Sequence, residues 1–359
     1  MKILQVASSL TDKGGIEKLV LRLSSGLIEL GHEVEIAAVP DSWVWERAKA
    51  ENIKLQPLIV KRQYDFSALK PCMELFRRER YDIVNLHFAP DFIVPALAAR
   101  LAHQSNVVMT RHLVKKWRGT KAWMYGRGLG YRKIIGVSNA VRNALVSGGI
   151  PDEMIEVVHV GVNLEPIVSG SLRSELGLPA SRVLIGIVSR VSAEKGHADL
   201  LEAMLQADAK AVCVVIGDGP DLLKLKEYAL SHGLSERAFF LGWRTDSDTL
   251  VASLDIVVQP SVWEEACSAA ILEGMARGKP LVVTDSGGNA ELVLNGKTGI
   301  VVPKSDPTKL AEALNILIRD PDLRRQYGEN GLIRQQSLFT KESMCKGTEE
   351  VFFKLISKQ

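Results

Sequence analysis

Residues 183–217, VLIGIVSRVSAEKGHADLLEAMLQADAKAVCVVIG, decide the fold class of this chain. Two short apolar runs, Val183–Ser189 and Ala211–Gly217, have the length of buried β-strands. Between them, His197–Gln206 has the apolar spacing that is typical of an amphipathic helix. A strand, a helix and a further strand in this order indicate a parallel sheet with helices on its faces.

The same alternation runs through the whole chain and restarts once, with helix-like segments between most of the strands. In the first half, the predicted strands are Lys2–Ser8, Glu33–Val39, Lys54–Val60, Asp82–Phe88, Asn106–His112, Lys133–Ser138 and Glu156–Val162. In the second half, they are Val183–Ser189, Ala211–Gly217, Ala238–Gly242, Ile256–Pro260, Pro280–Thr284 and Gly299–Val302.

We therefore expect an α/β protein with two Rossmann-like, doubly wound parallel-sheet domains and a cleft between them. The segment Asn163–Ala180, which contains Pro, Gly and Ser, is the predicted linker. It separates an N-terminal domain, residues 1–163, from a C-terminal domain, residues 164–339. A last helix, at about residues 340–359, could pack on either domain.

Composition argues against several classes of protein. A net charge of +3 over 359 residues gives no overall field for binding nucleic acid. The four cysteines form no CxxC pair, which argues against a disulfide scaffold or a cysteine zinc site and suits a reducing compartment. No apolar run has the length of a transmembrane helix, and the N-terminal one is too short for a signal peptide. We expect a cytoplasmic protein whose membrane association, if any, is peripheral.

Ligands of open parallel sheets bind beyond the carboxyl ends of the strands, so the residues that follow each strand are candidates for function. After the first predicted strand, the chain reads Gly14-Gly15-Ile16-Glu17 at the start of a helix. Two glycines let backbone N–H groups approach an anion at a helix N-terminus. A plain strand-to-helix turn would explain the pair equally well.

Two cationic residues flank the loop after the strand Val183–Ser189. Arg190 closes that strand, and Lys195 enters the next helix. For phosphate, Arg offers a planar fork and Lys a compact charge, so the two could neutralise a leaving diphosphate without a metal ion. The alternative is two solvated loop charges.

The strongest local feature is PSVWEEACSAAILEGMARGKP, at residues 260–280. Glu265 lies in the loop before a predicted helix, Ser268 is its expected N-cap, and Glu273 falls in its second turn. Helical side chains lean toward the N-terminus, so Glu273 is expected to face the site, where carboxylates accept hydrogen bonds from sugar hydroxyls. An acidic helix start, which the helix dipole favours, is the plain alternative.

Two histidines, His87 and His112, each close a predicted strand of the first half. We expect His87 to be structural, because a lone histidine more often is. His112 lies beside Arg111 and before a loop, and it is the better candidate for contact with substrate.

The stretch from Arg111 to Lys133 is basic and contains no acidic residue. Its lysines include Lys115 and Lys116, and its interleaved aromatic residues are Trp117, Trp123, Tyr125 and Tyr131. Such a stretch suits an anionic membrane surface or a phosphorylated acceptor. A solvated basic face with partly buried aromatic residues fits it equally well.

Over nearly its whole length, the chain resembles the retaining glycosyltransferases of family four, which have the GT-B fold. The motifs that carry the resemblance are GGIE (14–17), VSNAV (137–141), VHVGVN (158–163), RVSAEKG (190–196), VIGDGP (215–220), FLGW (240–243), EACSAAILE (265–273), MARGKP (275–280) and GGNAE (287–291). Their joint order and spacing are far more specific than any one of them.

The resemblance implies a role for each donor-side residue. Arg190 and Lys195 would hold the donor diphosphate, which would also face the backbone N–H of Gly15. Glu265 would bind hydroxyls of the donor sugar and Glu273 those of the ribose. His112 would lie beside the transferred sugar. The candidates on the acceptor side are Gly14, Glu17, His87, Arg111, Lys115 and Lys116.

One motif departs from the family's pattern. The usual Gly-Phe-Gly after the first glutamate is Ala266-Cys267-Ser268 here. Small residues are retained, so close approach of the backbone to phosphate is still expected, and Cys267, Ser268 and Ala269 remain donor-binding candidates. The departure bears on the identity of the donor more than on activity.

The resemblance thus implies a retaining transfer from a nucleoside diphosphate-sugar, UDP before GDP, to a hydroxyl of an acceptor. The basic stretch favours a cell-envelope glycan or a lipid-linked precursor as that acceptor. No metal or other cofactor is expected, because two cations can stabilise the diphosphate and helix capping explains the DxD pair of Asp246 and Asp248. Two alternatives stay open, a sugar-nucleotide 2-epimerase and a catalytically silent partner subunit.

Overall fold

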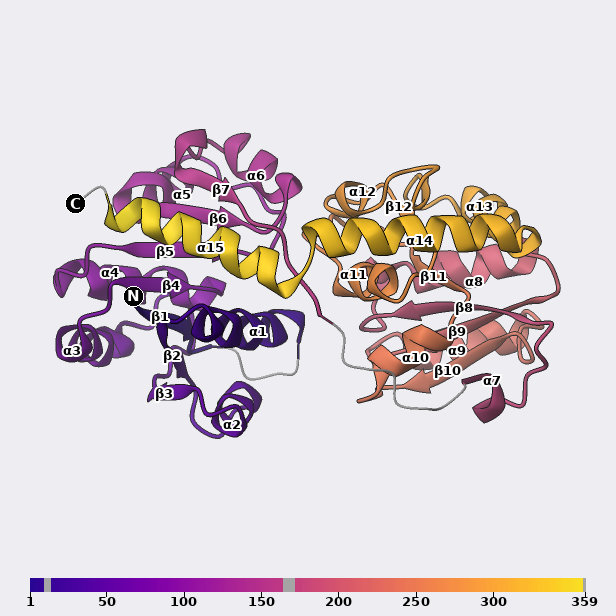
Figure 1. Cartoon of the computed structure of the whole chain (residues 1–359), viewed down its shortest axis with the longest axis horizontal. Coiled ribbons are helices and arrows are strands. Elements are labelled where there is room, and N and C mark those ends of the chain that lie inside the picture. Colours follow the sequence, from indigo (N-terminus) through magenta and orange to yellow (C-terminus); the bar gives the residue numbers. More distant parts are fainter. Residues whose placement is uncertain (10–13, 164–171, 358–359) are drawn as a thin grey trace. The chain divides into compact units, whose positions relative to one another are not determined.

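The computed structural model describes residues 1–9, 14–163 and 172–357, which form two compact units (Figure 1). The first unit comprises Met1–Gly161 together with Lys341–Gln359, and the second comprises Val162–Thr340. Residues 10–13, which directly precede Gly14, and residues 164–171 of the predicted linker lie outside the described residues.

The first unit is built on a seven-stranded sheet with the order β3-β2-β1-β4-β5-β6-β7, in which every pair of strands is parallel. The strands are β1 (Lys2–Ala7), β2 (Glu33–Ala38), β3 (Lys54–Pro57), β4 (Ile83–Leu86), β5 (Val107–Arg111), β6 (Lys133–Gly136) and β7 (Ile155–Val157). The helices are α1 (Gly15–Glu29), α2 (Trp43–Ala50), α3 (Leu69–Glu79), α4 (Val94–Leu101), α5 (Thr120–Trp123), α6 (Asn139–Val146) and α15 (Lys341–Ile356).

The second unit has a six-stranded parallel sheet with the order β10-β9-β8-β11-β12-β13. The strands are β8 (Val183–Val188), β9 (Ala211–Ile216), β10 (Ala238–Gly242), β11 (Ile256–Gln259), β12 (Leu281–Thr284) and β13 (Gly299–Val302). The helices are α7 (Leu172–Glu175), α8 (His197–Gln206), α9 (Leu222–Ser231), α10 (Ser247–Ser253), α11 (Ala269–Ala276), α12 (Asn289–Leu292), α13 (Pro307–Arg319) and α14 (Pro321–Leu338).

The α/β class with two Rossmann-like parallel sheets is confirmed, and each predicted strand overlaps an observed one. The largest difference is at β7, which was predicted over Glu156–Val162 and ends at Val157. Val158 N still donates to Gly136 O of β6 at 3.0 Å, and the residues after it bond to the C-terminal part of the chain. Gly161 N donates to Met344 Sδ at 3.4 Å, and Val162 N donates to Phe339 O at 2.9 Å.

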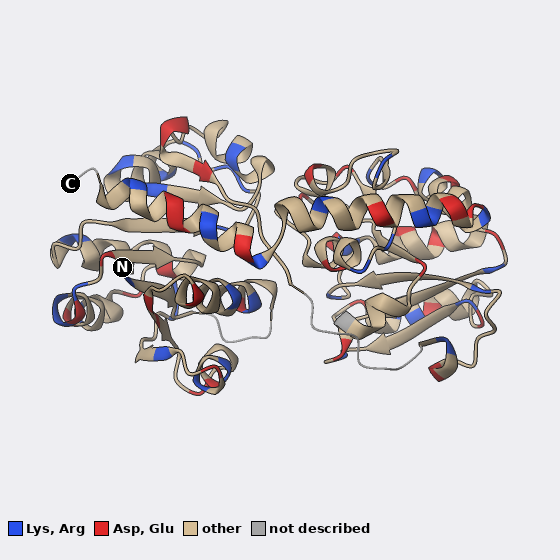
Figure 2. Cartoon of the chain, viewed as in Figure 1, with Lys and Arg blue, Asp and Glu red and all other residues tan. Residues whose placement is uncertain are grey.

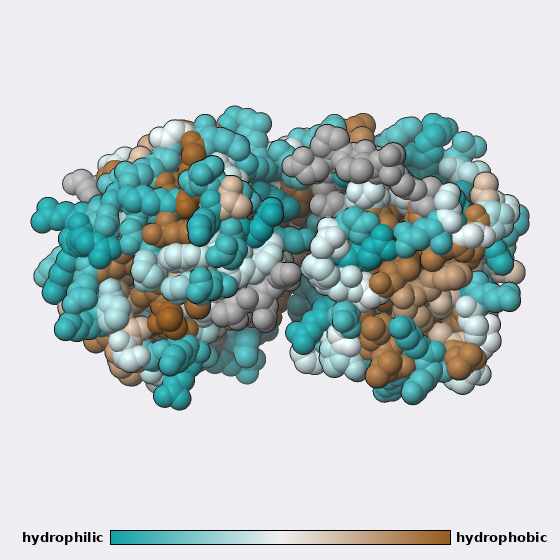
Figure 3. All heavy atoms as spheres, turned by 90° about the horizontal axis from the view of Figure 1, so that it is seen from below, coloured by the Kyte–Doolittle hydropathy of each residue, from teal (hydrophilic) through white to brown (hydrophobic). Residues whose placement is uncertain are grey.

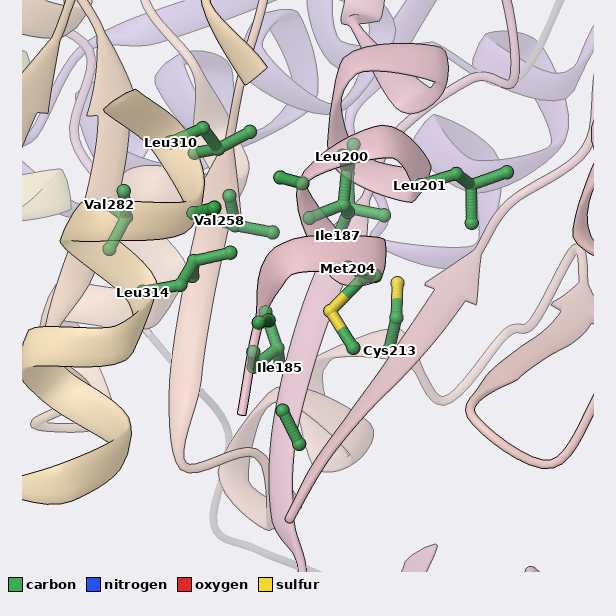
Figure 4. Packing of buried hydrophobic residues seen from close by; sticks show 14 of the residues in the cluster. Ile185, Ile187, Leu200, Leu201, Met204, Cys213, Val258, Val282, Leu310 and Leu314 are labelled. Carbon is green, nitrogen blue, oxygen red and sulfur yellow. The ribbon is translucent and has the colours of Figure 1, made fainter. Parts of the chain in front are cut away.

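Burial of one helical face explains the core of the second unit (Figure 4). Leu200, Leu201 and Met204 of α8 pack over Ile185 and Ile187 of β8, and all five side chains are fully buried. Each large apolar side chain contributes about 1.5–3 kcal/mol when it leaves water. Such packing holds β8 and the loop after it in a fixed position.

The last helix, α15, packs against α1 of the first unit. Gly26 permits this approach, because a Cβ there would lie 2.3 Å from the Sγ of Cys345. Lys341 Nζ lies 2.7 Å from Glu29 Oε1, and His32 Nε2 lies 2.7 Å from Glu349 Oε1. Residues of both charges are interspersed along α14 and α15 (Figure 2).

The surface is mixed in character, and the face in Figure 3 is largely hydrophilic, with apolar residues gathered on part of it. Leu223 and Leu230 of α9 are among the most exposed large apolar side chains. None of the helices in the described part of the chain combines the length and apolar character needed to cross a bilayer.

Candidate functional site

Each sheet has one point at which the order of its strands reverses. In the second unit this point lies between β8 and β11, and in the first unit between β1 and β4. Loops that leave such strands run in opposite directions and open a crevice at the carboxyl edge, where ligands of this class of sheet bind. The candidate residues follow these strands.

In the second unit, the two loops at this point are joined by the side chains of Lys195 and Glu265. Lys195 Nζ lies 2.6 Å from Glu265 Oε1, although the residues are 70 positions apart in sequence. The same carboxylate oxygen accepts a hydrogen bond from Ser261 Oγ at 2.7 Å. The side chains of Lys195 and Glu265 are 25% and 15% exposed, so this charged pair is largely but not fully buried. Both remain accessible to a polar ligand.

Backbone contacts hold these two loops together. Gly196 has φ +74°, and a Cβ there would lie 1.8 Å from Pro260 O. Val262 N donates to Glu194 O at 3.0 Å and joins the two loops. The side chain of Thr284, at the end of β12, fixes the second loop by donating to Ser261 O at 2.6 Å. Only glycine fits at position 196, because any side chain would separate the loops that carry Lys195 and Glu265.

The other donor-side candidates lie near the same edge of the sheet. Arg190 follows β8 and is exposed, so its guanidinium is open to a ligand. Glu273 lies on α11 and is buried. Ser268 occupies the N-cap position of α11 as predicted, but its hydroxyl makes no capping hydrogen bond. Cys267 is partly buried, and Ala269 begins the helix.

In the first unit, the loop after β1 leads into α1 through Gly14 and Gly15. Gly15 is exposed, and a Cβ at this position would meet nothing within 4 Å, so the backbone N–H is open to approach. The carboxylate of Glu17 folds back over Gly14, where Oε2 would lie 2.4 Å from a Cβ. Glu17 is buried in this position, and the helix dipole favours a carboxylate there.

His87 and His112 follow the neighbouring strands β4 and β5 and lie side by side. Their ring centroids are 5.5 Å apart at an interplanar angle of 20°, and His87 Nδ1 is 3.3 Å from His112 Nε2. His87 is 1% exposed and His112 is partly exposed. Burial lowers the pKa of His112 to about 3, with a smaller effect from the charge of Arg111, so the ring is neutral at physiological pH. Burial likewise holds the pKa of His87 well below its usual value.

The basic stretch after β5 is divided between core and surface. Arg111 is 3% exposed, its Cζ lies 4.8 Å from the ring of Trp117, and burial lowers its pKa to about 10. Trp117, Tyr125 and Tyr131 are buried, so they are core residues and not interfacial ones. Trp123 is 65% exposed, and Lys115 and Lys116 are exposed as well.

The predicted explanation of the DxD pair is wrong for Asp246. Its side chain makes no capping hydrogen bond at the start of α10 and instead pairs with Arg244, at 2.8 Å between Nη2 and Oδ2. That hydrogen bond lowers the pKa of the Asp246 carboxyl. The side chain of Asp248 lies outside the described residues. In the described ranges, no group of three or more His, Cys, Asp or Glu residues could hold a metal ion.

Sequence reasoning missed Ser261, which is fully buried and donates to Glu265. It follows β11 by two residues, so the rule that identified Arg190 could have identified it. Gln5, Asn85 and Thr110, buried beneath the two histidines, were also missed. These three lie within strands β1, β4 and β5, and the rule that ligands bind beyond the ends of strands does not point to them.

Two family models match the chain and together span most of its length. The one described as "Glycosyltransferase Family 4" matches residues 13–166, and the one described as "Glycosyl transferases group 1" matches residues 169–334.

The chain is also similar to individual proteins and to solved structures. The chain is 30% identical over 283 residues to the UDP-Gal:alpha-D-GlcNAc-diphosphoundecaprenol alpha-1,3-galactosyltransferase of Escherichia coli, covering 72% of this chain and 71% of that protein. It is 23% identical to the N-acetyl-alpha-D-glucosaminyl L-malate synthase of Bacillus anthracis, covering 96% and 94%. The crystal structure of Anabaena HepE in complex with UDP superimposes with a TM-score of 0.87 at 22% identity, covering 99% and 100%.

Proposed function

The chain belongs to glycosyltransferase family 4 and is a glycosyltransferase with the GT-B fold, and from this premise we propose that it transfers a sugar from a UDP-sugar, with GDP as the second choice of nucleotide, to a hydroxyl of an acceptor. The observation that carries the proposal is the Lys195–Glu265 pair at the strand-order reversal of the second unit. A cation for phosphate and a carboxylate for hydroxyls, side by side, suit a nucleotide-sugar.

The donor would bind along the loops that follow β8 and β11. The guanidinium of Arg190 and the ammonium of Lys195 bind the diphosphate, and the backbone around Cys267, Ser268 and Ala269 approaches it closely. Glu265 accepts hydrogen bonds from hydroxyls of the donor sugar, and Glu273 from those of the ribose. His112 and the backbone N–H of Gly15 are the contributions of the first unit.

The chemical step needs charge stabilisation rather than a protein nucleophile. As the bond between the anomeric carbon and the diphosphate oxygen breaks, Arg190 and Lys195 stabilise the negative charge on the leaving group. The acceptor oxygen bonds to the same face of the anomeric carbon and gives its proton to the leaving diphosphate, so the configuration is retained. The two cations do the work that a metal ion would do, and no metal is required in this proposal.

Named relatives support the choice of substrates. HepE has been crystallised with UDP and with UDP-glucose. The name of the E. coli relative gives UDP-Gal as its donor and a sugar on diphosphoundecaprenol as its acceptor. We extend these to a UDP-sugar and to a cell-envelope glycan or lipid-linked precursor for this chain. Gly14, Glu17, Arg111, Lys115 and Lys116 are the acceptor-side candidates.

A thermal-shift panel of UDP-, GDP- and ADP-sugars tests the donor. At a concentration of 100 Kd, a ligand of the folded state stabilises it by about 2.7 kcal/mol, which corresponds to a rise in Tm of roughly 5–10 °C for a domain of this size. We expect UDP-sugars to give the largest rise. A panel in which no nucleotide changes the Tm would sink the proposal, and product analysis without acceptor would reveal an epimerase instead.

We further propose a peripheral contact between the first unit and an anionic membrane surface. Lys115, Lys116 and the 65% exposed Trp123 belong to one segment. The segment 61–66 adjoins it, because Gln63 Nε2 donates to the hydroxyl of Tyr125. Segment 61–66 adds the exposed Lys61, Arg62, Tyr64 and Phe66. Basic charge with exposed aromatic residues is typical of contact with anionic lipid.

Vesicle sedimentation checks this contact. Each Lys near an anionic bilayer is worth about 1 kcal/mol, so Lys115→Ala with Lys116→Ala should weaken binding to vesicles with anionic lipid about 30-fold. The charge-matched control, Lys70→Ala with Lys346→Ala, removes exposed lysines of α3 and α15 and should bind like the parent protein. Equal losses in both variants, or no binding by the parent, would contradict the membrane proposal.

A further inference from the structure

A file of buried polar side chains runs through the sheet of the first unit and ends at His112. Thr110 Oγ1 donates to Asn85 Oδ1 at 2.8 Å, and Asn85 Nδ2 donates to Gln5 Oε1 at 3.0 Å. Gln5 Oε1 lies 2.7 Å from His87 Nε2, and His87 Nδ1 lies 3.3 Å from His112 Nε2. Apart from His112, every member is less than 5% exposed. The file therefore connects a rigid sheet interior to one partly exposed imidazole.

The file has a direction, which follows from the hydrogen-bonding capacity of each atom. His87 Nε2 lies 2.7 Å from the acceptor Gln5 Oε1 and 3.2 Å from Asn85 Nδ2, which donates to Gln5 Oε1. The shorter contact decides: two acceptors 2.7 Å apart would repel, so His87 Nε2 carries a hydrogen. A neutral imidazole has one N–H, which leaves a lone pair on His87 Nδ1. His112 Nε2 must then carry a hydrogen and donate it to His87. The Nδ1 of His112 is left with a lone pair.

We propose that His87 is a positioning residue that holds His112 in the Nε2–H tautomer, so that Nδ1 of His112 accepts a hydrogen bond from a hydroxyl of the substrate sugar. The inference rests on the proposed function for the identity of that ligand. The tautomer of a histidine is set by the hydrogen bond that its other nitrogen makes, and the near-parallel rings limit rotation of His112.

The direction of the file decides what His112 can recognise. When His87 Nε2 donates to Gln5, the Nδ1 of His112 is an acceptor and binds a hydroxyl that donates a hydrogen bond. If both amides of Gln5 and Asn85 were reversed, His87 would donate from Nδ1, and His112 would offer an N–H instead. Burial lowers the pKa of both rings, so His112 stays neutral at physiological pH and its Nδ1 does not become a donor through protonation. The two polarities therefore predict different ligands.

Long-range ¹H–¹⁵N spectra of protein with ¹⁵N-labelled histidine measure the tautomers directly. We expect His87 and His112 both to be neutral Nε2–H rings, assigned by the loss of their signals in single variants. Nδ1–H forms at both positions would overturn the proposal. This readout needs no substrate, so it stands whether or not the proposed transfer reaction is found.

Two variants at His87 separate positioning from packing. The Oδ1 of asparagine occupies nearly the place of Nδ1, so His87→Asn should keep His112 in the Nε2–H form and retain most of the activity. Phenylalanine keeps the ring but offers no acceptor, so His87→Phe should give a mixture of tautomers at His112 and lower kcat/KM about 10–100-fold. The Tm rise with UDP should be the same in both. A His87→Phe protein with a single Nε2–H tautomer and full activity would overturn the inference.

Discussion

Replacing Lys195 by alanine is expected to lower kcat about 10²–10³-fold, since removing one preorganised stabiliser of a developing charge has an effect of this size. The ammonium lies 2.6 Å from Glu265 and is one of two cations assigned to the leaving diphosphate. Charge builds on that group mainly as the glycosidic bond breaks, so kcat should fall more than KM rises. Steady-state kinetics with the donor identified by the thermal-shift panel measures both.

Lys195→Arg and a remote control make this result interpretable. Lys195→Arg keeps the charge but not its compact shape, and an intermediate loss is expected. Lys309→Ala removes a Lys–Glu pair of 2.7 Å on α13, where both side chains are more than half exposed, and should leave kcat unchanged. Full activity in a folded Lys195→Ala protein would refute the assignment of Lys195 to the diphosphate.

The alternation of strands and helices could be predicted from sequence because each buried strand is a short apolar run and each helix has one apolar face. Strand ends were less predictable. Phe88 and Ser138 continue their apolar or small-residue runs but lie beyond the last ladder hydrogen bonds of β4 and β6. An apolar run indicates which residues are buried, and buried residues continue past the end of the strand into the loop. The end of an apolar run therefore does not mark the end of a strand.

Neighbours across the sheet could not be predicted in the same way. Lys195 and Glu265 both follow strands, but their contact depends on β11 pairing with β8 although β9 and β10 intervene in sequence. The pairing of β4 with β5 likewise places His112 beside His87. His87 was expected to be structural, and it is buried, but its hydrogen bond to His112 was outside the reach of residue patterns.

Residues with two common roles were the hardest to interpret. Trp117 and Tyr125 suit a membrane interface or a core, and their stacked rings, 4.1 Å apart between centroids, lie in the core. Asp246 suits a helix cap or an ion pair, and the nearby Arg244 decides for the pair. In each case the outcome depends on where the side chains point, which the local sequence pattern does not reveal even when the partner, such as Arg244, is only two residues away.

Gly196→Ala is expected to destabilise the second unit by about 3 kcal/mol and to lower kcat/KM at least about 100-fold. A left-handed conformation costs alanine about 1 kcal/mol. The larger effect is the contact of a Cβ 1.8 Å from Pro260 O, which forces apart the loops that carry Lys195 and Glu265. Denaturant unfolding and steady-state kinetics measure the two losses.

Gly233→Ala is the matched control for this prediction. Gly233 has φ +71°, close to the +74° of Gly196, but a Cβ at this position meets nothing within 4 Å. It lies between α9 and β10, so alanine there should cost only the backbone strain of about 1 kcal/mol and leave activity intact. The difference between the two variants isolates the contact of the loops from glycine's backbone freedom. Equal stability and activity in both would mean that the close approach of Gly196 to Pro260 does not hold the site together.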